Sequence, residues 1–198
     1  MSSKIVLASS SRIRSQMLTN AGIPHESIKT CIDEDAAKIK LLSNKTTHYK
    51  IAEKLAETKA EKVTMQRPQS YVIGCDQVLS FEGKLYSKPK NKLILRNQLR
   101  EMSGKTHELI SVAVVYKDMK LIWSHAGSVK LSMRRLSDSA IERYVETNWR
   151  KIKFCAGGYE IESKGVQLIE KIDGDFFTIL GMPLLEVISF FKESGILD

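Results

Sequence analysis

LASSSRIRSQML, residues 7–18, joins a predicted strand to a predicted helix. The apolar run from Lys4 to Ala8 is typical of a short buried strand. From Ser11 to Ala21 apolar side chains recur at helical spacing, and Gly22 follows as a stop signal. A strand that leads directly into a helix is a building unit of α/β folds, so this stretch favours that fold class.

The same stretch is a candidate phosphate-binding turn. Ser9, Ser11 and Arg14 lie where the helix begins, and unpaired backbone N–H groups and the helix dipole attract anions there. An arginine adds bidentate recognition of phosphate oxygens. The alternative is ordinary helix capping by serine beside solvated arginines.

The rest of the chain alternates between helical and extended patterns, and tight hairpins interrupt the order. Further helices are predicted over residues 48–65, 90–102, 137–146 and from Pro183 onward, and further strands over residues 26–29, 71–75, 78–81, 84–86, 109–116, 121–134 and 166–172. This order predicts an α/β fold with a mixed sheet flanked by helices, rather than a purely parallel sheet. No repeat or linker-like tract divides the chain, so we expect one domain over residues 1–198.

Composition restricts the classes of partner. The chain has 198 residues and a net charge of +8, which favours polyanions, either nucleic acid or a small molecule that carries phosphate. No recognisable nucleic-acid-binding motif is present, which counts against nucleic acid. No apolar run approaches the roughly 20 residues of a membrane span, and the run at residues 5–8 is too short for a signal peptide. We therefore expect a cytoplasmic protein that makes no membrane contact.

Acidic side chains in two places are candidates for metal binding or catalysis. Asp76, in GCDQV at residues 74–78, follows a predicted strand and is expected to project from its end into a crevice. A carboxylate there could bind Mg²⁺ or act as general base on water, or it could simply open a turn. The second cluster, at residues 33–35, could supply metal ligands or start the helical region that follows.

Two later segments could also contact a substrate. Lys88 precedes a proline, which favours an extended backbone from which its side chain could reach a phosphate; a solvated lysine is the alternative. Glu160 and Glu162 would share one side of a strand, and the alternative is a glycine turn that leads into a polar edge strand.

Taken together, these segments resemble the Maf family. The match comprises LASSSRIRSQML for the family's LASxSPRRxxLL, Ile32-Asp33-Glu34 for its acidic segment, GCDQV for GxDxV, SKP at residues 87–89 for GKP, SGKTHE at 103–108, AGGYEIESKG at 156–165 and GMPL at 181–184. Order and spacing agree over nearly the whole chain, which makes the resemblance specific.

The resemblance implies an elongated, two-lobed fold with a central cleft, related to inosine-triphosphate pyrophosphatases. It implies hydrolysis of a nucleoside triphosphate to the monophosphate and diphosphate, with Mg²⁺ or Mn²⁺ as cofactor. By position, Asp76 matches the general base, and Glu34 matches a carboxylate that would hold the metal together with Asp76. The groups that match the family's phosphate-binding residues are Ser9, Ser11, Arg14 and Lys88. A homodimer is also compatible with the family, as is a nucleotide-binding role in septum formation without significant turnover.

Three positions bear on the nucleobase. The family branch that prefers dTTP and UTP has Arg, Thr and Gln where this chain has Ile13, Gln77 and Glu162. Gln77 and Glu162 resemble the branch that acts on 7-methylguanosine triphosphate, whereas Ile13 matches neither branch. A carboxylate at position 162 could accept hydrogen bonds from a guanine-like N–H edge. These residues predict a purine or methylated purine triphosphate as the better substrate.

Overall fold

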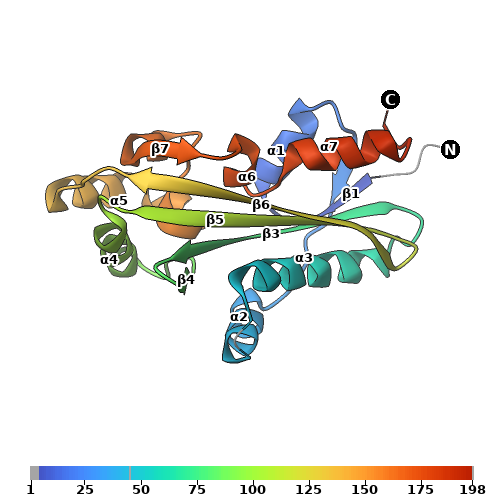
Figure 1. The fold of residues 1–198 in the computed structure, drawn as a ribbon, viewed down its shortest axis with the longest axis horizontal. Coiled ribbons are helices and arrows are strands. Elements are labelled where there is room, and N and C mark those ends of the chain that lie inside the picture. Colours follow the sequence, from blue (N-terminus) through green and yellow to red (C-terminus); the bar gives the residue numbers. More distant parts are fainter. Residues whose placement is uncertain (1–4, 45, 198) are drawn as a thin grey trace. The chain divides into compact units, whose positions relative to one another are not determined.

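The computed structural model describes residues 5–44 and 46–197 (Figure 1). Its strands are β1 (Ile5–Ala8), β2 (His25–Ser27), β3 (Tyr71–Phe81), β4 (Lys84–Tyr86), β5 (Thr106–Lys117), β6 (Lys120–Met133) and β7 (Ile169–Asp173). They form one sheet in the order β2-β1-β3-β5-β6-β7, with β4 paired to β3. β1 is parallel to β2 and β3, whereas β4 and β7 are antiparallel to their neighbours. The predicted mixed α/β sheet is confirmed; Lys4, the first residue of the predicted strand, lies outside the described residues.

Helices flank this sheet. They are α1 (Arg12–Asn20), α2 (Glu34–Ser43), α3 (His48–Thr64), α4 (Lys92–Met102), α5 (Asp138–Ile152), α6 (Phe176–Ile179) and α7 (Leu184–Glu193), with short 3₁₀ turns at Ala156–Gly158 and Lys164–Leu168. Within the described ranges, every helix is too short or too polar to cross a bilayer.

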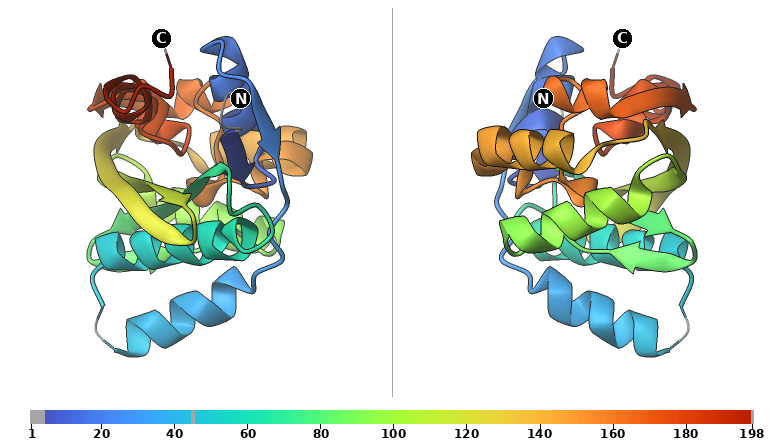
Figure 2. Two further views of the ribbon diagram at one scale, coloured as in Figure 1. Left: turned by 90° about the vertical axis from the view of Figure 1, so that its right-hand side faces the viewer. Right: turned by 90° about the vertical axis from the view of Figure 1, so that its left-hand side faces the viewer.

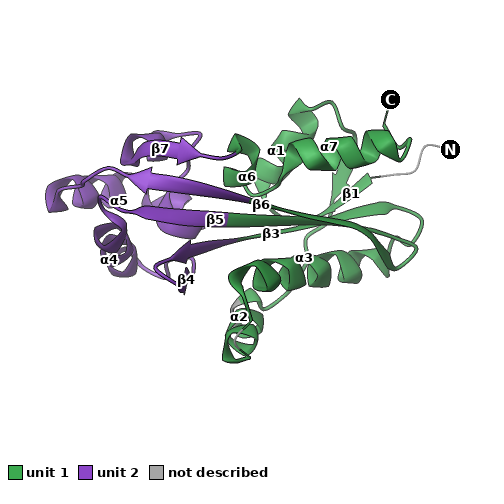
Figure 3. Ribbon diagram, in the orientation of Figure 1, with its two compact units in different colours: residues 1–77, 110–127, 175–198 green, residues 78–109, 128–174 purple. Residues whose placement is uncertain are grey.

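The chain divides into two compact units (Figure 3). The first contains residues 1–77, 110–127 and 175–198, and the second contains residues 78–109 and 128–174. Strands β3, β5 and β6 contribute residues to both units. The single domain over residues 1–198 stays a prediction.

In the first unit, β3 carries different residues on its two faces because side chains alternate along a strand. Ile73 and Cys75 join an apolar cluster with residues of α1 and α7, among them Leu18 and Phe191, which are fully buried. α3 covers the opposite face of the sheet, and α2 lies outside α3 (Figures 1 and 2). The face toward α3 is the one that carries Asp76.

Gly74 determines how closely α3 approaches β3. A Cβ atom at this position would lie 2.2 Å from the backbone oxygen of Ala56 and 2.9 Å from the Cβ of Ala60. Both contacts are shorter than van der Waals separation, and one of them is with backbone, which cannot rotate away. Only glycine therefore permits the observed distance between helix and strand.

Gly74→Ala is expected to force α3 away from β3. The free energy of unfolding should fall by about 2 kcal/mol or more, within the range measured for overpacked cores. Chemical denaturation measures this loss, and Gly83→Ala is the matched control, since a Cβ at Gly83 would meet no atom within 4 Å. Equal stability of the two variants would contradict the close approach; Gly83 has a φ of +75°, so some cost is expected in the control as well.

Two predictions about strands are wrong. β3 runs unbroken from Tyr71 to Phe81, so Asp76 lies in the middle of a strand and not at its end. The polar pair Asp76 and Gln77 suggests a break, but inside the sheet Oδ1 of Asp76 accepts from Lys59 and the amide nitrogen of Gln77 donates to backbone carbonyl oxygens.

The other error concerns the start of the strand predicted over residues 166–172, because Lys164–Leu168 form a 3₁₀ segment. Residues 161–163 form a turn, so Glu160 and Glu162 do not share a strand face. Gly165 explains the fold-back, because a Cβ there would lie 2.4 Å from the backbone oxygen of Glu160. β7 begins only at Ile169.

The second unit buries a histidine in its core. His107 is 2% exposed, and its Nε2 lies 2.6 Å from the hydroxyl oxygen of Tyr159. Its Nδ1 has no hydrogen-bond partner among the described residues. Burial lowers the pKa of His107 from its ordinary value of 6.5 to about 4, because the charged imidazolium would lose its hydration.

His107 should make stability depend on pH. Between pH 6.5 and 4 the unfolded chain binds a proton at this histidine that the folded protein does not, so the free energy of unfolding falls as the pH falls. The expected loss is about 3 kcal/mol across this window. We expect His107→Gln to remove that part of the pH dependence, measured by denaturant unfolding at pH 7, 5.5 and 4. Parallel pH profiles for the variant and the unchanged protein would contradict this assignment.

Candidate functional site

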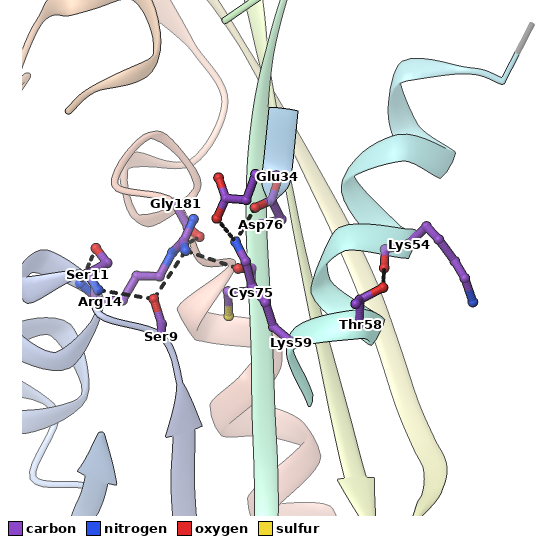
Figure 4. A network of polar contacts seen from close by, with 10 residues as sticks. All are labelled: Ser9, Ser11, Arg14, Glu34, Lys54, Thr58, Lys59, Cys75, Asp76 and Gly181. Carbon is purple, nitrogen blue, oxygen red and sulfur yellow. Dashed lines mark hydrogen bonds and ion pairs between the residues drawn. The ribbon is translucent and has the colours of Figure 1, made fainter. Parts of the chain in front are cut away.

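The centre of the first unit holds a buried ion-paired group. Lys59, on α3, places its ammonium 2.7 Å from Oε1 of Glu34, the first residue of α2, and it also donates to Oδ1 of Asp76 on β3 (Figure 4). Lys59 is 5% exposed and Asp76 is 3% exposed. We name Glu34, Lys59 and Asp76 the acid–lysine cluster. Glu34 and Asp76 therefore lie close together, as predicted, and Lys59 pairs with both carboxylates.

Local structure brings these three side chains together. Gly74 lets α3 lie against β3, which carries Lys59 to Asp76. Asp33 is the N-cap of α2, and its Oδ1 accepts a 2.9 Å hydrogen bond from the backbone N–H of Ala36. The interpretation that the acidic segment starts a helix is confirmed for Asp33, whereas Glu34 pairs with Lys59 and its role as a metal ligand stays a prediction.

One oxygen of Asp76 remains available. Its Oδ2 is buried and has no hydrogen-bond partner among the described residues, whereas Oδ1 accepts from Lys59. A buried carboxylate oxygen without a partner is costly and rare in folded proteins. Oδ2 is therefore suited to accept a hydrogen bond from water or to coordinate a cation.

The predicted phosphate turn combines capping with anchoring. Ser11 is the N-cap of α1, and its Oγ accepts from the backbone N–H of Arg14 at 3.5 Å. Arg14 is 9% exposed; its Nε donates to the carbonyl oxygen of Gly181 at 2.8 Å, and its Nη1 donates to that of Cys75 at 3.0 Å. Nη1 also lies 3.5 Å from Oγ of Ser9. Arg14 thus fixes the turn to the residue that precedes Asp76 (Figure 4).

Part of Arg14 stays free for an anion. A guanidinium has five N–H groups, and no hydrogen bond of Nη2 is formed with any residue that the structure describes. A pocket of about 280 Å³ opens beside the same turn. Its lining is mostly hydroxyl-bearing and consists of Ser9, Ser10, Ser11, Arg12, Ser15, Gln16, Thr19 and Ser27.

Two of the predicted specificity positions, Ile13 and Gln77, lie in the first unit. Ile13 is half-buried on α1. Gln77 is half-buried on β3, and the two N–H groups of its amide are shared among three acceptors at 2.9–3.0 Å, Oγ of Ser111 and the carbonyl oxygens of Thr178 and Ile179. Gln77 therefore has a fixed orientation.

Lys88 and Glu162 belong to the second unit and are both exposed. Both act electrostatically on Cys155. Burial, together with the negative charges of Glu160 and Glu162, raises the pKa of this thiol to about 12, against the opposing effect of Lys88. Lys88 and Glu162 thus lie around one thiol, and their contact with a substrate stays a prediction.

Comparison with known proteins identifies the family. The model of the Maf family, described as "Maf-like protein", matches residues 4–194. The chain belongs to the Maf family. It is 44% identical to a nucleoside triphosphate pyrophosphatase of Ruegeria pomeroyi, over 98% of both chains. It is also 44% identical to the protein of that name from Caulobacter vibrioides, over 98% of this chain and 96% of the relative. A 7-methyl-GTP pyrophosphatase of Brucella abortus is 40% identical over the full length of both chains.

The donors of this Maf chain fit a divalent cation. Within the described ranges, no cluster of three or more His, Cys, Asp or Glu side chains occurs that could hold a metal alone. Mg²⁺, however, is commonly bound by one or two carboxylates together with water and substrate phosphates. Glu34 and Asp76, with the unpaired Oδ2, provide such a partial set.

Lys59 is the member of the cluster that sequence reasoning missed. A usable signal was present in the apolar stripe of α3, where Leu55, Ala56, Ala60 and Val63 are buried and Lys59 falls between them. A lysine in the buried stripe of a helix is almost never unpaired. In this Maf chain it points to the acidic partners on α2 and β3.

Proposed function

We propose that this chain is a nucleoside triphosphate pyrophosphatase, a hydrolase that cleaves between the α and β phosphates and releases the monophosphate and diphosphate. The names of full-length relatives support the reaction class. The observation that carries the proposal is the buried acid–lysine cluster, in which Asp76 keeps one carboxylate oxygen without a protein partner. A protein that only binds nucleotides does not need a buried carboxylate with one oxygen left for water or a cation.

Each group of the first unit has a chemical task in this proposal. Oδ2 of Asp76 accepts a proton from the attacking water or holds that water in line. Lys59 balances the charge of the two carboxylates and keeps Asp76 in one position through Oδ1. Arg14 offers Nη2 to a phosphate oxygen, and Ser9 and Ser11 line a pocket at the same turn.

A divalent cation, when bound by Glu34 and Asp76, would neutralise phosphate charge and lower the pKa of a bound water. A carboxylate alone is a weak base at neutral pH, so orientation and charge neutralisation must supply most of the activation. Lys88 would add a further positive charge for the leaving diphosphate.

The preferred substrate in this proposal is a purine or 7-methylguanosine triphosphate. Gln77 and Glu162 support it, because both can present oxygen acceptors to the N–H edge of a base. We expect kcat/KM for 7-methyl-GTP to exceed that for dTTP and UTP at least about tenfold, since a polar site discriminates strongly when its hydrogen bonds are left unmade.

A coupled assay of diphosphate release with Mg²⁺ or Mn²⁺ measures this preference. Comparable turnover of dTTP and 7-methyl-GTP would contradict the assignment of the base. Tight nucleotide binding without diphosphate release from any triphosphate would instead favour a regulatory nucleotide-binding protein.

A further inference from the structure

The hydrogen bonds around Gln77 determine which end of its amide is available to a ligand. Two of its three partners are backbone carbonyl oxygens, those of Thr178 at 3.0 Å and Ile179 at 2.9 Å. A carbonyl oxygen only accepts, so the amide group facing both of them must be the nitrogen, whatever the ambiguity of amide orientation in general. Oε1 of Gln77 therefore points away from these carbonyls.

Ser111 completes this arrangement. Its hydroxyl is fully buried, accepts from Nε2 of Gln77 at 3.0 Å and donates to the carbonyl oxygen of Thr178 at 2.8 Å. The serine hydroxyl thus donates its single proton to the carbonyl oxygen of Thr178 and accepts from the amide nitrogen of Gln77. No protein hydrogen bond to Oε1 occurs within the described ranges, and Oε1 is not among the buried atoms that lack a partner.

The carbonyls that hold Gln77 are themselves fixed. They lie at the end of α6, and the carbonyl oxygen of Thr178 also accepts from the backbone N–H of Gly181 at 3.1 Å. Asp175 caps the start of α6, and its Oδ2 accepts from the backbone N–H of Thr178 at 2.6 Å and from its hydroxyl at 2.9 Å. Gly127 makes room for this residue, since a Cβ there would lie 2.6 Å from Oγ1 of Thr178.

We propose that Ser111 and the end of α6 act as positioning groups that make Gln77 a pure hydrogen-bond acceptor, and that the enzyme thereby selects nucleobases that present an N–H donor to it. Free glutamine can donate or accept, so it would tolerate either edge of a base. Held in this way, Gln77 accepts a hydrogen bond from a ring N–H or an amino group of the base. A base edge that carries only acceptors would face the amide oxygen without forming a hydrogen bond. This inference rests on the proposed function and narrows its substrate class.

The test compares nucleotides from which a hydrogen-bond donor of the base has been removed, in one case by deletion of an amino group and in the other by methylation of a ring nitrogen. GTP carries the N1–H and the 2-amino group, ITP lacks the amino group, and 1-methyl-GTP lacks the N1–H. The donor preference is the larger of two ratios of Kd, ITP to GTP or 1-methyl-GTP to GTP, measured with non-hydrolysable α,β-methylene analogues. kcat/KM for the three natural triphosphates is measured in parallel.

We expect a donor preference of about fivefold or more in the unchanged protein, the size that one neutral hydrogen bond contributes. Gln77→Met, which keeps the length of the side chain but removes the amide oxygen, should reduce it at least about twofold, while the acceptor proposed at Glu162 remains. Ser111→Ala should reduce it partly, because the amide loses one of its anchors. Ser132→Ala is the matched control, since it removes a comparable hydroxyl pair with Thr106 in the second unit and should leave the ratio unchanged.

Two results would overturn the inference: equal affinity of the unchanged protein for all three nucleotides, or an undiminished donor preference in Gln77→Met. Thermal unfolding of each variant separates loss of folding from loss of base selection. If either Gln77→Met or Ser111→Ala fails to fold, the other variant still tests the inference. Because the ratio is measured by binding, an absence of diphosphate release would count against the proposed function alone.

Discussion

Replacing Asp76 by Asn should lower kcat for diphosphate release about a thousandfold, within the range that removal of a general base produces. Asparagine keeps the shape of the side chain but can neither accept the proton of water nor carry the charge paired with Lys59. Steady-state kinetics with a saturating purine triphosphate and Mn²⁺ measure the effect. KM should change much less than kcat, because the phosphate contacts proposed for the first unit come from other residues.

Asp138→Asn is the control for this prediction. The same substitution there affects a side chain that is 78% exposed and pairs with Arg100 on the surface. It should leave kcat unchanged. An Asp76→Asn enzyme that folds normally and keeps more than about a tenth of the activity would remove Asp76 from the proposed chemistry.

Replacing Lys59 by Met should destabilise the protein by about 3 kcal/mol, because it leaves the carboxylates of Glu34 and Asp76 close together without their shared cation. Mn²⁺ or Mg²⁺ should restore part of that loss, since a divalent ion can take the position of the ammonium and stabilises by binding the folded state. Denaturant unfolding in EDTA and in excess Mn²⁺ gives both numbers.

Thr58→Ala is the neighbouring control on α3. Thr58 is half-buried and donates only to the backbone oxygen of Lys54 in its own helix (Figure 4). The free energy of unfolding of Thr58→Ala should differ from that of the unchanged protein by no more than about 0.5 kcal/mol, with or without metal. If Lys59→Met loses stability but metal has no effect on it, the carboxylates do not form the proposed cation site.

Most of the fold follows from patterns that a single sequence contains. Helix α3 is an example, since its apolar stripe and length predict residues 48–65 and the structure has His48–Thr64. The long pair β5 and β6 is predicted equally well from β-branched runs around a turn. The failures occur where tertiary contacts override local signals. The polar residues Asp76 and Gln77 suggest the end of a strand, yet β3 continues through them because both have hydrogen-bond partners beside the sheet. Gly165 folds the chain back against Glu160.

The candidate site was predictable in part. Motif positions identify Asp76 and Glu34, but the sequence does not reveal that a lysine from a third element lies between them. Ser11 is a second example. A serine before a helix is expected both for helix capping and for phosphate binding, so the sequence alone does not distinguish the two roles. The orientation of Gln77 depends on backbone carbonyls a hundred residues later in the chain, and no local pattern contains that information.

The most direct test of the central claim is the identity of the products. The protein is incubated with GTP or 7-methyl-GTP and Mn²⁺, and phosphorus NMR follows the reaction alongside Asp76→Asn. Cleavage between the α and β phosphates predicts monophosphate and diphosphate in equal amounts, with neither formed by the variant. Nucleoside diphosphate with inorganic phosphate, or equal turnover by Asp76→Asn, would contradict the account.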